Sequence, residues 1–267
     1  MKNWITTEIE LDTNKKEKNR FLNRKFTLDA KGNILEEIEY DIESNILCKR
    51  IYRYFDTDEI QEYIEYDAIE NMSERHSYYK NELGYNYLTE FEYSSGHKII
   101  KESSFADNGS YDKTIIKDES GEIIGYEVYE FNDQGLVVKE IELDSDNNEV
   151  SRYEKIYDGN DNLIIEKHYQ DGSLHTGESF EYDDNDNVVR TIHRFYHEEY
   201  ETIETFRYDV KNNMIYNAVH QNGVLIFENI LEYNEGGNVI SEECFELNYW
   251  QNNVIRHSKR INELEIS

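Results

Sequence analysis

One short punctuation pattern recurs through the chain at nearly constant spacing, and it constrains the fold more than any other feature. An apolar or aromatic residue, usually followed by Asp or Asn, opens a polar segment that ends in Gly or Asn, as in Leu28–Asn33 (LDAKGN). The pattern recurs at Tyr40, Tyr66, Phe131, Leu143, Tyr157, Tyr182, Tyr208 and Tyr233, with weaker copies at Tyr54, Tyr79, Tyr93, Phe105, Tyr169, Phe195 and Leu247. Successive markers lie 12 to 14 residues apart, with degenerate stretches around Asp118 and near His220. Such a period indicates one structural unit copied many times.

The segments between the markers predict β-strands. Ile34–Tyr40 (ILEEIEY) and Leu136–Leu143 (LVVKEIEL) alternate β-branched or aromatic residues with charged ones. The Asp, Asn and Gly residues between them supply the chemistry of tight reversals. About 13 residues for a strand and a turn leave no room for a crossover helix, so we expect an all-β antiparallel meander of about 16–18 short strands. A parallel β-solenoid is the competing architecture, but this period is short for a coil with several strands and corners.

The composition opposes intrinsic disorder, although the formal net charge of −30 alone would suggest it. The chain has 23 Tyr, 11 Phe, two Trp and no proline. A protein of average composition and this length would have roughly 13 prolines. Their absence fits a chain in which nearly every backbone N–H is a donor in a sheet ladder.

The predicted sheet has apolar sides that carry carboxylates, as at Glu36 and Glu62, so we expect a thin sheet with both faces partly wet. Strand twist predicts an open sheet that curls. No linker is evident, so residues 1–267 are expected to form a single elongated domain, with repeats over 28–247, an N-terminal edge cap over 1–27 and a C-terminal edge cap over 248–267. Basic residues would protect these edges from aggregation or clamp an acidic surface: Lys15, Lys16, Lys18, Arg20, Arg24, Lys25, Arg256, Lys259 and Arg260.

The aromatic-Asp-x-x-Gly-Asn unit followed by an apolar strand resembles the YD or RHS repeat of bacterial toxin-associated proteins, from about Leu28 to Tyr233. That resemblance implies β-hairpin sheets that wrap into shells. This chain departs from the family pattern because it is short, lacks a recognisable toxin tip and is unusually acidic. A free-standing acidic protein of this type looks more like an immunity protein that accompanies a polymorphic toxin.

Motifs for catalysis, metals or cofactors are weak, and we expect no enzyme activity, no metal and no cofactor. His193 and His197 have the i, i+4 spacing of a helical zinc site, but on a strand such residues lie about 13 Å apart. Two segments imitate the start of a calcium loop, Asp144-Asp146-Asn148 and Asp183-Asn185-Asn187, but they lack the later Gly and Glu, and are interpreted as turns with at most weak calcium binding. No glycine-rich phosphate-binding segment is present. Cys48 and Cys244 indicate neither a disulfide framework nor a thiolate metal site.

The charge indicates a basic protein partner and disfavours nucleic acid and anionic membrane. With no signal-peptide core and no long apolar run, we expect a cytoplasmic protein. The leading hypothesis is a protein-binding immunity factor that occludes a basic toxin domain. Its expected contact residues form the densest acidic and aromatic region: Asp183, Asp184, Asp186, Glu198, Glu199, Tyr200 and Glu201. The alternatives are a structural or carbohydrate-binding repeat module, with strand-end tyrosines as sugar platforms, and an enzyme of unrecognised type.

Overall fold

The computed structural model describes residues 2–11, 16–105, 111–198, 200–247 and 254–265, and within them it has 20 strands and no helix. The strands are β1 (Lys2–Leu11), β2 (Glu17–Leu28), β3 (Ile34–Tyr40), β4 (Ile46–Tyr54), β5 (Ile60–Asp67), β6 (Met72–Lys80), β7 (Asn86–Tyr93), β8 (Lys98–Phe105), β9 (Tyr111–Asp118), β10 (Ile123–Phe131), β11 (Val137–Asp144), β12 (Glu149–Tyr157), β13 (Leu163–Gln170), β14 (Ser173–Tyr182), β15 (Val188–Phe195), β16 (Tyr200–Tyr208), β17 (Met214–Gln221), β18 (Val224–Tyr233), β19 (Val239–Leu247) and β20 (Val254–Glu265).

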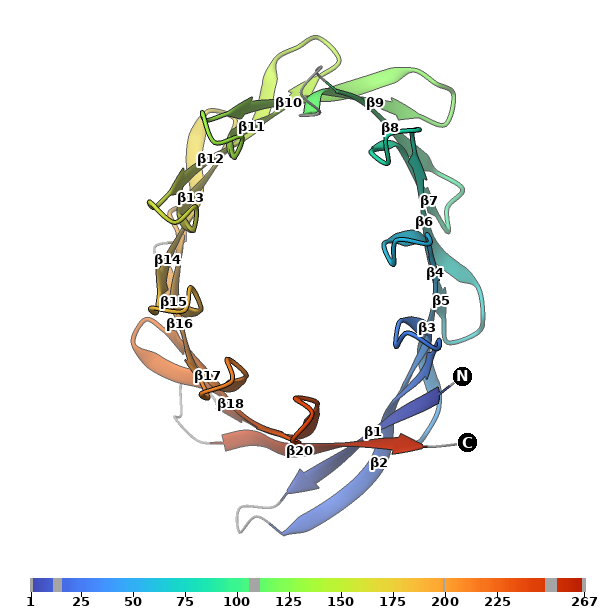
Figure 1. Ribbon diagram of the computed structural model, residues 1–267, viewed down its shortest axis with the longest axis vertical. Coiled ribbons are helices and arrows are strands. Elements are labelled where there is room, and N and C mark those ends of the chain that lie inside the picture. The colour runs from blue at the N-terminus through green and yellow to red at the C-terminus, as the bar shows by residue number, and fades with distance from the viewer. Residues whose placement is uncertain (1, 12–15, 106–110, 199, 248–253, 266–267) are drawn as a thin grey trace. The chain divides into compact units, whose positions relative to one another are not determined.

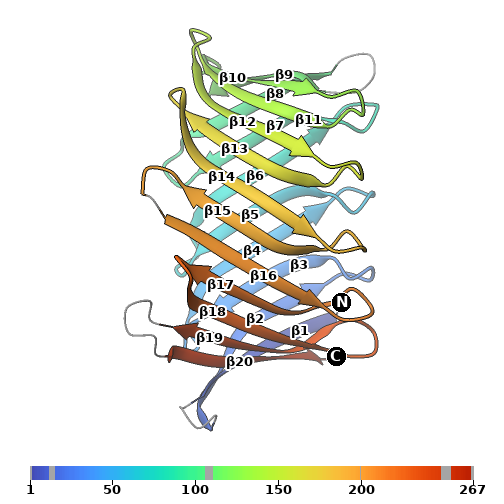
Figure 2. The ribbon, with the colours of Figure 1, turned by 90° about the vertical axis from the view of Figure 1, so that its left-hand side faces the viewer.

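Consecutive strands pair side by side, and the registers within β2–β11 and β13–β20 are antiparallel. Figure 2 shows this order for β13 to β17. The all-β antiparallel meander is therefore confirmed, and the parallel solenoid is excluded. The strand count exceeds the prediction because β1, β2 and β20 occupy the stretches expected to be edge caps.

Contacts divide the chain into two compact units, each built from separate chain segments. Unit 1 comprises Met1–Ile5, Leu22–Arg152 and Leu264–Ser267, and unit 2 comprises Thr6–Phe21 and Tyr153–Glu263. Unit 1 contains β3 to β11 and unit 2 contains β13 to β19, each following a curved course (Figure 1). The expectations of one elongated domain and of an open, curled sheet stay predictions.

Among the residues that the structure describes, none belongs to a helix with the length and apolarity needed to cross a membrane.

The turn segments fold as the punctuation predicts. In the turn after β2, the Asp29 N–H donates to the Asn33 carbonyl at 2.9 Å, and Asp29 Oδ1 accepts the backbone N–H groups of Lys31, Gly32 and Asn33 at 2.8, 2.8 and 2.9 Å. The fourth turn residue is left-handed, with φ of 101° at Gly32. Other turns place Asp, Asn, Ser or Glu at the same position. The Asp carboxylate thus accepts the backbone N–H groups that have no strand partner within the reversal.

Among the described turns, two are shorter than this pattern, and they lie near weak or degenerate copies of the repeat. Asp171-Gly172 and Asn222-Gly223 have positive φ at both residues, 49° and 75°, and 48° and 79°. Such two-residue reversals match the twist of the strands they join. A two-residue turn is too short for the Asp-x-x-Gly-Asn segment, so the spacing of the repeat markers becomes irregular near His220.

The turn aspartates predict how stability responds to acid. A hydrogen bond from the Asn187 side chain, and then one from its backbone N–H, lowers the pKa of Asp183, and Asp144 and Asp209 have lowered pKa values through the corresponding Asn148 and Asn213. A carboxyl whose pKa is lower in the folded state stabilises the fold above its unfolded pKa, and that contribution is lost as the pH falls. We expect the urea midpoint to be constant from pH 7 to 5 and to fall below about pH 4. A midpoint that rises on acidification would contradict this assignment.

A tyrosine at the end of several strands ties its strand to the start of the preceding, neighbouring strand. The hydroxyl of Tyr182 donates to the Leu163 carbonyl at 2.7 Å, and those of Tyr54, Tyr208 and Tyr233 donate to Ile34, Val188 and Met214 at 2.8, 2.9 and 2.7 Å. Each bond spans 19 or 20 residues. This explains the tyrosine of the repeat, and it supports the structural interpretation of these residues over sugar platforms.

We therefore expect Tyr182→Phe to lower the free energy of unfolding by about 1 kcal/mol, because it removes one part-buried hydrogen bond and leaves the Leu163 carbonyl without its donor. Tyr196→Phe is the matched control, since Tyr196 is 45% exposed and lies outside this series. Urea unfolding followed by tyrosine fluorescence measures both variants. Equal effects would show that the Tyr182 hydroxyl contributes nothing specific.

The sheet has little apolar core, as expected for a thin sheet with wet faces. The buried apolar residues are Ile9, Phe21, Ile64, Ile116 and Ala218, whereas the buried polar residues are more numerous: Thr6, Glu8, Glu37, Thr114, Asn217, Asn229, Ser241 and Ser258. Burying so many polar groups requires partners for them. Those partners come from the facing positions of adjacent strands.

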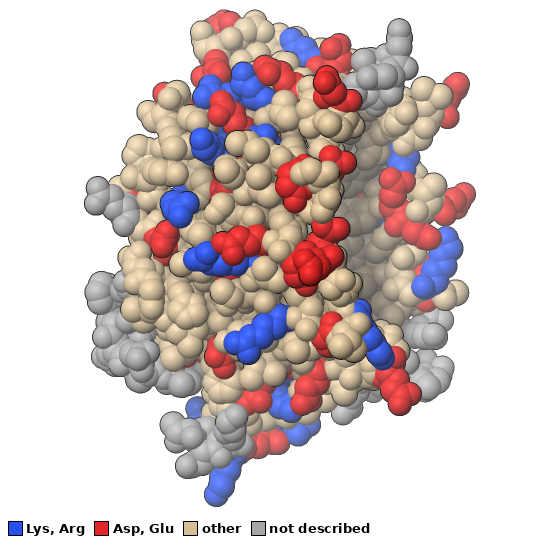
Figure 3. Space-filling model, turned by 60° about the vertical axis from the view of Figure 1, so that its left-hand side comes forward, with Lys and Arg blue, Asp and Glu red and all other residues tan. Residues whose placement is uncertain are grey.

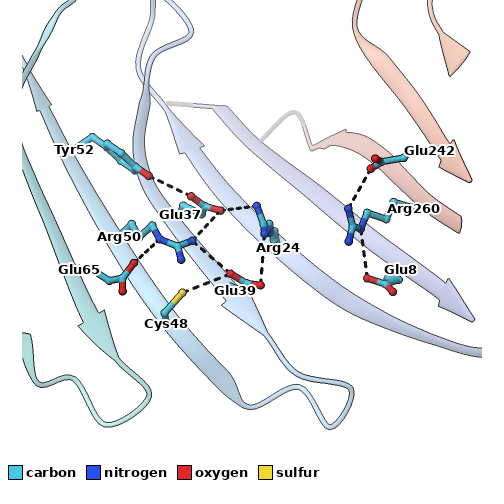
Figure 4. Close-up of polar contacts among 10 residues, drawn as sticks. All are labelled: Glu8, Arg24, Glu37, Glu39, Cys48, Arg50, Tyr52, Glu65, Glu242 and Arg260. Carbon is cyan, nitrogen blue, oxygen red and sulfur yellow. Dashed lines mark hydrogen bonds and ion pairs between the residues drawn. The ribbon is translucent and has the colours of Figure 1, made fainter. Parts of the chain in front are cut away.

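In unit 1, two arginines hold the buried carboxylate of Glu37 (Figure 4). Glu37 Oε1 lies 3.2 Å from Arg24 and 3.4 Å from Arg50, at ion-pair distance but without hydrogen-bond geometry. Arg50 also contacts Glu39 at 3.4 Å and donates to Glu65 at 2.7 Å. Arg24, expected to protect a sheet edge, is instead an internal partner of β3.

A row of rings continues along the same face of unit 1. Tyr52, Tyr63, His76 and Phe91 occupy facing positions on β4 to β7, with ring centroids 5.5, 5.3 and 4.8 Å apart. Burial, and then the nearby Glu37 carboxylate, raise the pKa of Tyr52 to about 12. Aromatic pairs and ion pairs therefore replace the aliphatic packing of an ordinary sheet.

In unit 2, β20 pairs with β19 and also with β1, so the basic residues near the C-terminus are not all at a free edge. Arg260 lies between Glu8 at 3.4 Å and Glu242 at 3.2 Å (Figure 4). Glu8 is 1% exposed. The Glu242 carboxylate also accepts the Asn229 side-chain amide at 2.8 Å, which continues the network onto β18. Lys15 and the Arg256 side chain lie outside the described residues.

Candidate functional site

Three of the sequence-predicted contact residues line a groove in unit 2, which we call the acidic groove. Asp183, Asp184 and Asp186 lie in the turn between β14 and β15. The groove has a volume of about 490 Å³ and is lined by Asp158, Asn160, Asn162, Ile164, Phe180, Glu181, Tyr182, Asp183, Asp184 and Asp186. The groove therefore lies between the β14–β15 turn and the β12–β13 turn, which is 25 residues earlier in the chain.

Hydrogen bonds between these two turns fix the shape of the acidic groove. Asn162 Nδ2 donates to Asp186 Oδ1 at 2.8 Å, and Asn160 Nδ2 lies 3.4 Å from the same oxygen. Asp186 has a positive φ of 59°, which aims its side chain at the neighbouring turn. Asp183 is held by the backbone N–H groups of Asn185 and Asn187 at 2.9 and 3.0 Å. Hydrogen bonds within and between the two turns thus fix the conformation of the groove.

The acidic groove is a local concentration of negative charge. Its lining has five carboxylates and no Lys or Arg. Hydrogen bonds from Asn187 lower the pKa of Asp183, so it is ionised at neutral pH. Asp184 is exposed and has no partner among the residues that the structure describes. One cation is nearby, since Arg190 donates to Glu181 at 2.8 Å. On the face drawn in Figure 3, acidic and basic side chains are interspersed.

The remaining predicted residues lie at the opposite end of β15. Asp183 to Asp186 precede this strand and Glu198 follows it, and its eight residues place the two turns roughly 25 Å apart. Glu201 faces Arg194 at 3.3 Å, and the ring of Tyr200 stacks on Phe195 with centroids 4.4 Å apart. Glu199 lies outside the described residues. The single contact region predicted from sequence is therefore two places in the structure.

Tyr200 belongs to a second groove in unit 2, which we call the aromatic groove. Its volume is about 450 Å³, and it is lined by Glu178, Thr191, His193, Phe195, Tyr200, Thr202, Glu204 and Val219 from β14 to β17. Of these residues, the sequence identified only Tyr200 as a contact residue and considered His193 only as a zinc ligand. Only the strand register brings them together, and no single motif contains them.

The motifs considered for metals have other partners in the structure. His193 Nδ1 contacts Glu178 Oε1 at 2.6 Å, whereas the ring of His197 lies 5.3 Å from that of His175. Asp144 accepts the backbone N–H groups of Asp146 and Asn148 at 2.9 and 2.8 Å, as a turn aspartate does. Within the described part of the chain, no group of three or more His, Cys, Asp or Glu residues has the arrangement of a metal site.

Both cysteines are free thiols that are part of polar contacts between strands. Cys48 Sγ lies 3.6 Å from Glu39, and Cys244 Sγ lies 3.2 Å from the Asn229 side-chain oxygen. Burial raises the pKa of Cys48, which disfavours the reactive thiolate.

No protein-family model and no curated protein matches the sequence. Among solved structures, the chain is similar to a porin-like protein from Bacteroides uniformis, with 10% identity over 98% of this chain and 97% of that one, and a TM-score of 0.42. It also matches the structure of TcdB2-TccC3-TEV, with 10% identity over 89% of this chain and 15% of that one (TM-score 0.36), and the Photorhabdus luminescens Tc holotoxin pore, with 12% identity over 94% and 18% (TM-score 0.35). We draw no functional conclusion from similarities at this level.

Proposed function

We propose that this chain is a non-enzymatic protein-binding protein that holds a basic partner, and that the partner is a toxin domain which it occludes as an immunity protein. The acidic groove carries the proposal. It combines five carboxylates with the apolar side chains of Ile164, Phe180 and Tyr182, and its lining includes no basic residue. The toxin identity of the partner comes from the repeat resemblance of the sequence.

The geometry of the acidic groove suits a protruding basic segment. Its walls are two turns cross-linked by Asn162 and Asp186, so binding would not have to order them first. Exposed carboxylates such as Asp184 would raise the rate of encounter with a cation, and Tyr182 and Phe180 would supply apolar contact. A surface of this kind requires no catalytic group.

The test is to purify the chain and measure its binding to the basic protein encoded by the adjacent gene, together with growth of cells that express that protein alone or with the chain. We expect a 1:1 complex and restored growth. A variant with Asp183, Asp184 and Asp186 changed to Asn should bind the partner about a hundredfold more weakly and protect growth less. A partner that binds neither the chain nor its variant, with no protection of growth, would refute the proposed function.

A further inference from the structure

The aromatic groove has the chemistry of a receptor for one cationic side chain. We propose that it binds the side chain of an arginine carried by the basic protein partner. This inference rests on the proposed function for the source of that arginine. The acidic groove and the aromatic groove would then be two separate contacts of the same partner, at opposite ends of β15.

The strand registers place the lining residues on one face. His193 faces Glu178 on one side and Thr202 on the other, so these three residues form one row across β14, β15 and β16. A second row contains Thr191, Glu204 and Val219, and a third pairs Phe195 with Tyr200. Side chains two apart on a strand share a face, so the three rows are consecutive along one groove.

One part of the aromatic groove offers two anchored carboxylates. Glu178 Oε1 is held by His193 at 2.6 Å, and Glu204 Oε1 accepts the side-chain amide of Asn217 at 2.8 Å. The second oxygen of each carboxylate has no partner among the described residues. No Lys or Arg contributes to the lining. These oxygens are therefore positioned acceptors for a cation that the chain itself does not supply.

The other end offers aromatic faces. The rings of Phe195 and Tyr200 are nearly parallel, with an interplanar angle of 15°, and His193 lies 4.7 Å from Phe195. Tyr200 and Glu204 are four residues apart on β16, about 13 Å along an extended strand. The groove thus changes along its length from aromatic to anionic.

An arginine side chain fits a groove with an aromatic end and an anionic end better than a lysine side chain does. Its apolar stem can lie along an aromatic face while its head group reaches a carboxylate, and the planar guanidinium can itself stack on a ring. It donates in a fork that suits a carboxylate oxygen pair or two separate acceptors. Lysine has the same charge, but its ammonium group is not planar and cannot donate in a bidentate fork.

The test titrates N-acetyl-arginine methylamide into the full chain, followed by NMR shifts of the His193 ring and by calorimetry. The lysine and citrulline analogues are the matched ligands, because lysine retains the charge and citrulline retains the planar shape without it. We expect saturable binding of the arginine analogue, about tenfold weaker binding of the lysine analogue and none of the citrulline analogue.

The matched variants separate the groove from general electrostatics. Glu204→Gln and Tyr200→Leu should each weaken binding of the arginine analogue about tenfold or more, whereas Glu232→Gln removes the same charge from the other face of the sheet and should leave it unchanged. Glu204→Gln is nearly isosteric, so folding is retained. Equal binding of the three analogues, or equal loss in Glu204→Gln and Glu232→Gln, would overturn the inference.

The outcome for this groove is distinguishable from the outcome for the proposed function. If the arginine analogue binds and no basic protein does, the inference about the groove stands and the proposed function fails. If the basic protein binds the chain with the same affinity in wild type and Glu204→Gln, the proposed function stands and the inference fails.

Discussion

Arg50→Met is expected to lower the free energy of unfolding by about 2–3 kcal/mol, because a carboxylate that stays buried without its partner is costly. Arg50 lies within 3.4 Å of Glu37 and Glu39 and donates to Glu65 at 2.7 Å. The Glu37 side chain is 8% exposed. Methionine fills a similar volume but removes the cation shared by Glu37, Glu39 and Glu65. Arg24 is then the nearest cation to Glu37 and Glu39.

Arg53→Met is the control for this effect. Arg53 lies on the same strand as Arg50 but on the other face, is 65% exposed, and pairs with Glu62. An exposed pair contributes roughly 0–1 kcal/mol, so this variant should differ little from wild type. Urea unfolding of the two variants in parallel, at low and at high salt, measures the difference. Similar losses for Arg50→Met and Arg53→Met would mean that the buried ion pairs do not hold unit 1 together.

The second large effect is expected on binding. Changing Asp183, Asp184 and Asp186 together to Asn should weaken the complex with a basic partner about a hundredfold, chiefly by slowing association, since charge steers encounter. Asn retains the side-chain oxygen that caps the turn at Asp183, so the groove keeps its shape. The loss is therefore assigned to charge.

A variant with the same change in net charge controls for long-range attraction. Asp56→Asn, Asp112→Asn and Asp133→Asn also remove three exposed carboxylates, all in unit 1. Association rates measured by biolayer interferometry over a series of salt concentrations compare the two triple variants. Equal rates would mean that total charge, and not the acidic groove, attracts the partner.

The repeat predicted the fold because its residues act locally. A turn such as Asp29–Asn33 needs only its own side chains to form, and its spacing sets the length of the strands on either side. The terminal strands were missed because the Lys2–Leu11 and Val254–Glu265 segments lack the aromatic-Asp punctuation at their outer ends. The basic residues near the two termini were interpreted as edge protection or as a clamp on an acidic surface. In the structure, Arg24 and Arg260 pair with glutamates on neighbouring strands.

The candidate site was predicted only in part, and the reason is again geometric. Asp183 and Tyr200 are 17 residues apart, which is close in sequence, but β15 lies between them and carries them to opposite ends of the sheet. Conversely, Asp158 and Asp186 belong to different repeats, and the return of the chain through β13 and β14 places them on one groove. Such neighbours can be found from sequence by comparing turns two repeats apart, because alternate turns of a meander lie at the same end.

The most direct test of the central claim is hydrogen exchange of the chain with and without its basic partner. If unit 2 holds the partner in the acidic groove, slowed exchange should centre on residues 158–164 and 180–187, with a second protected region around 193–204. Slowed exchange confined to unit 1, or an unchanged pattern in a saturated complex, would contradict the account.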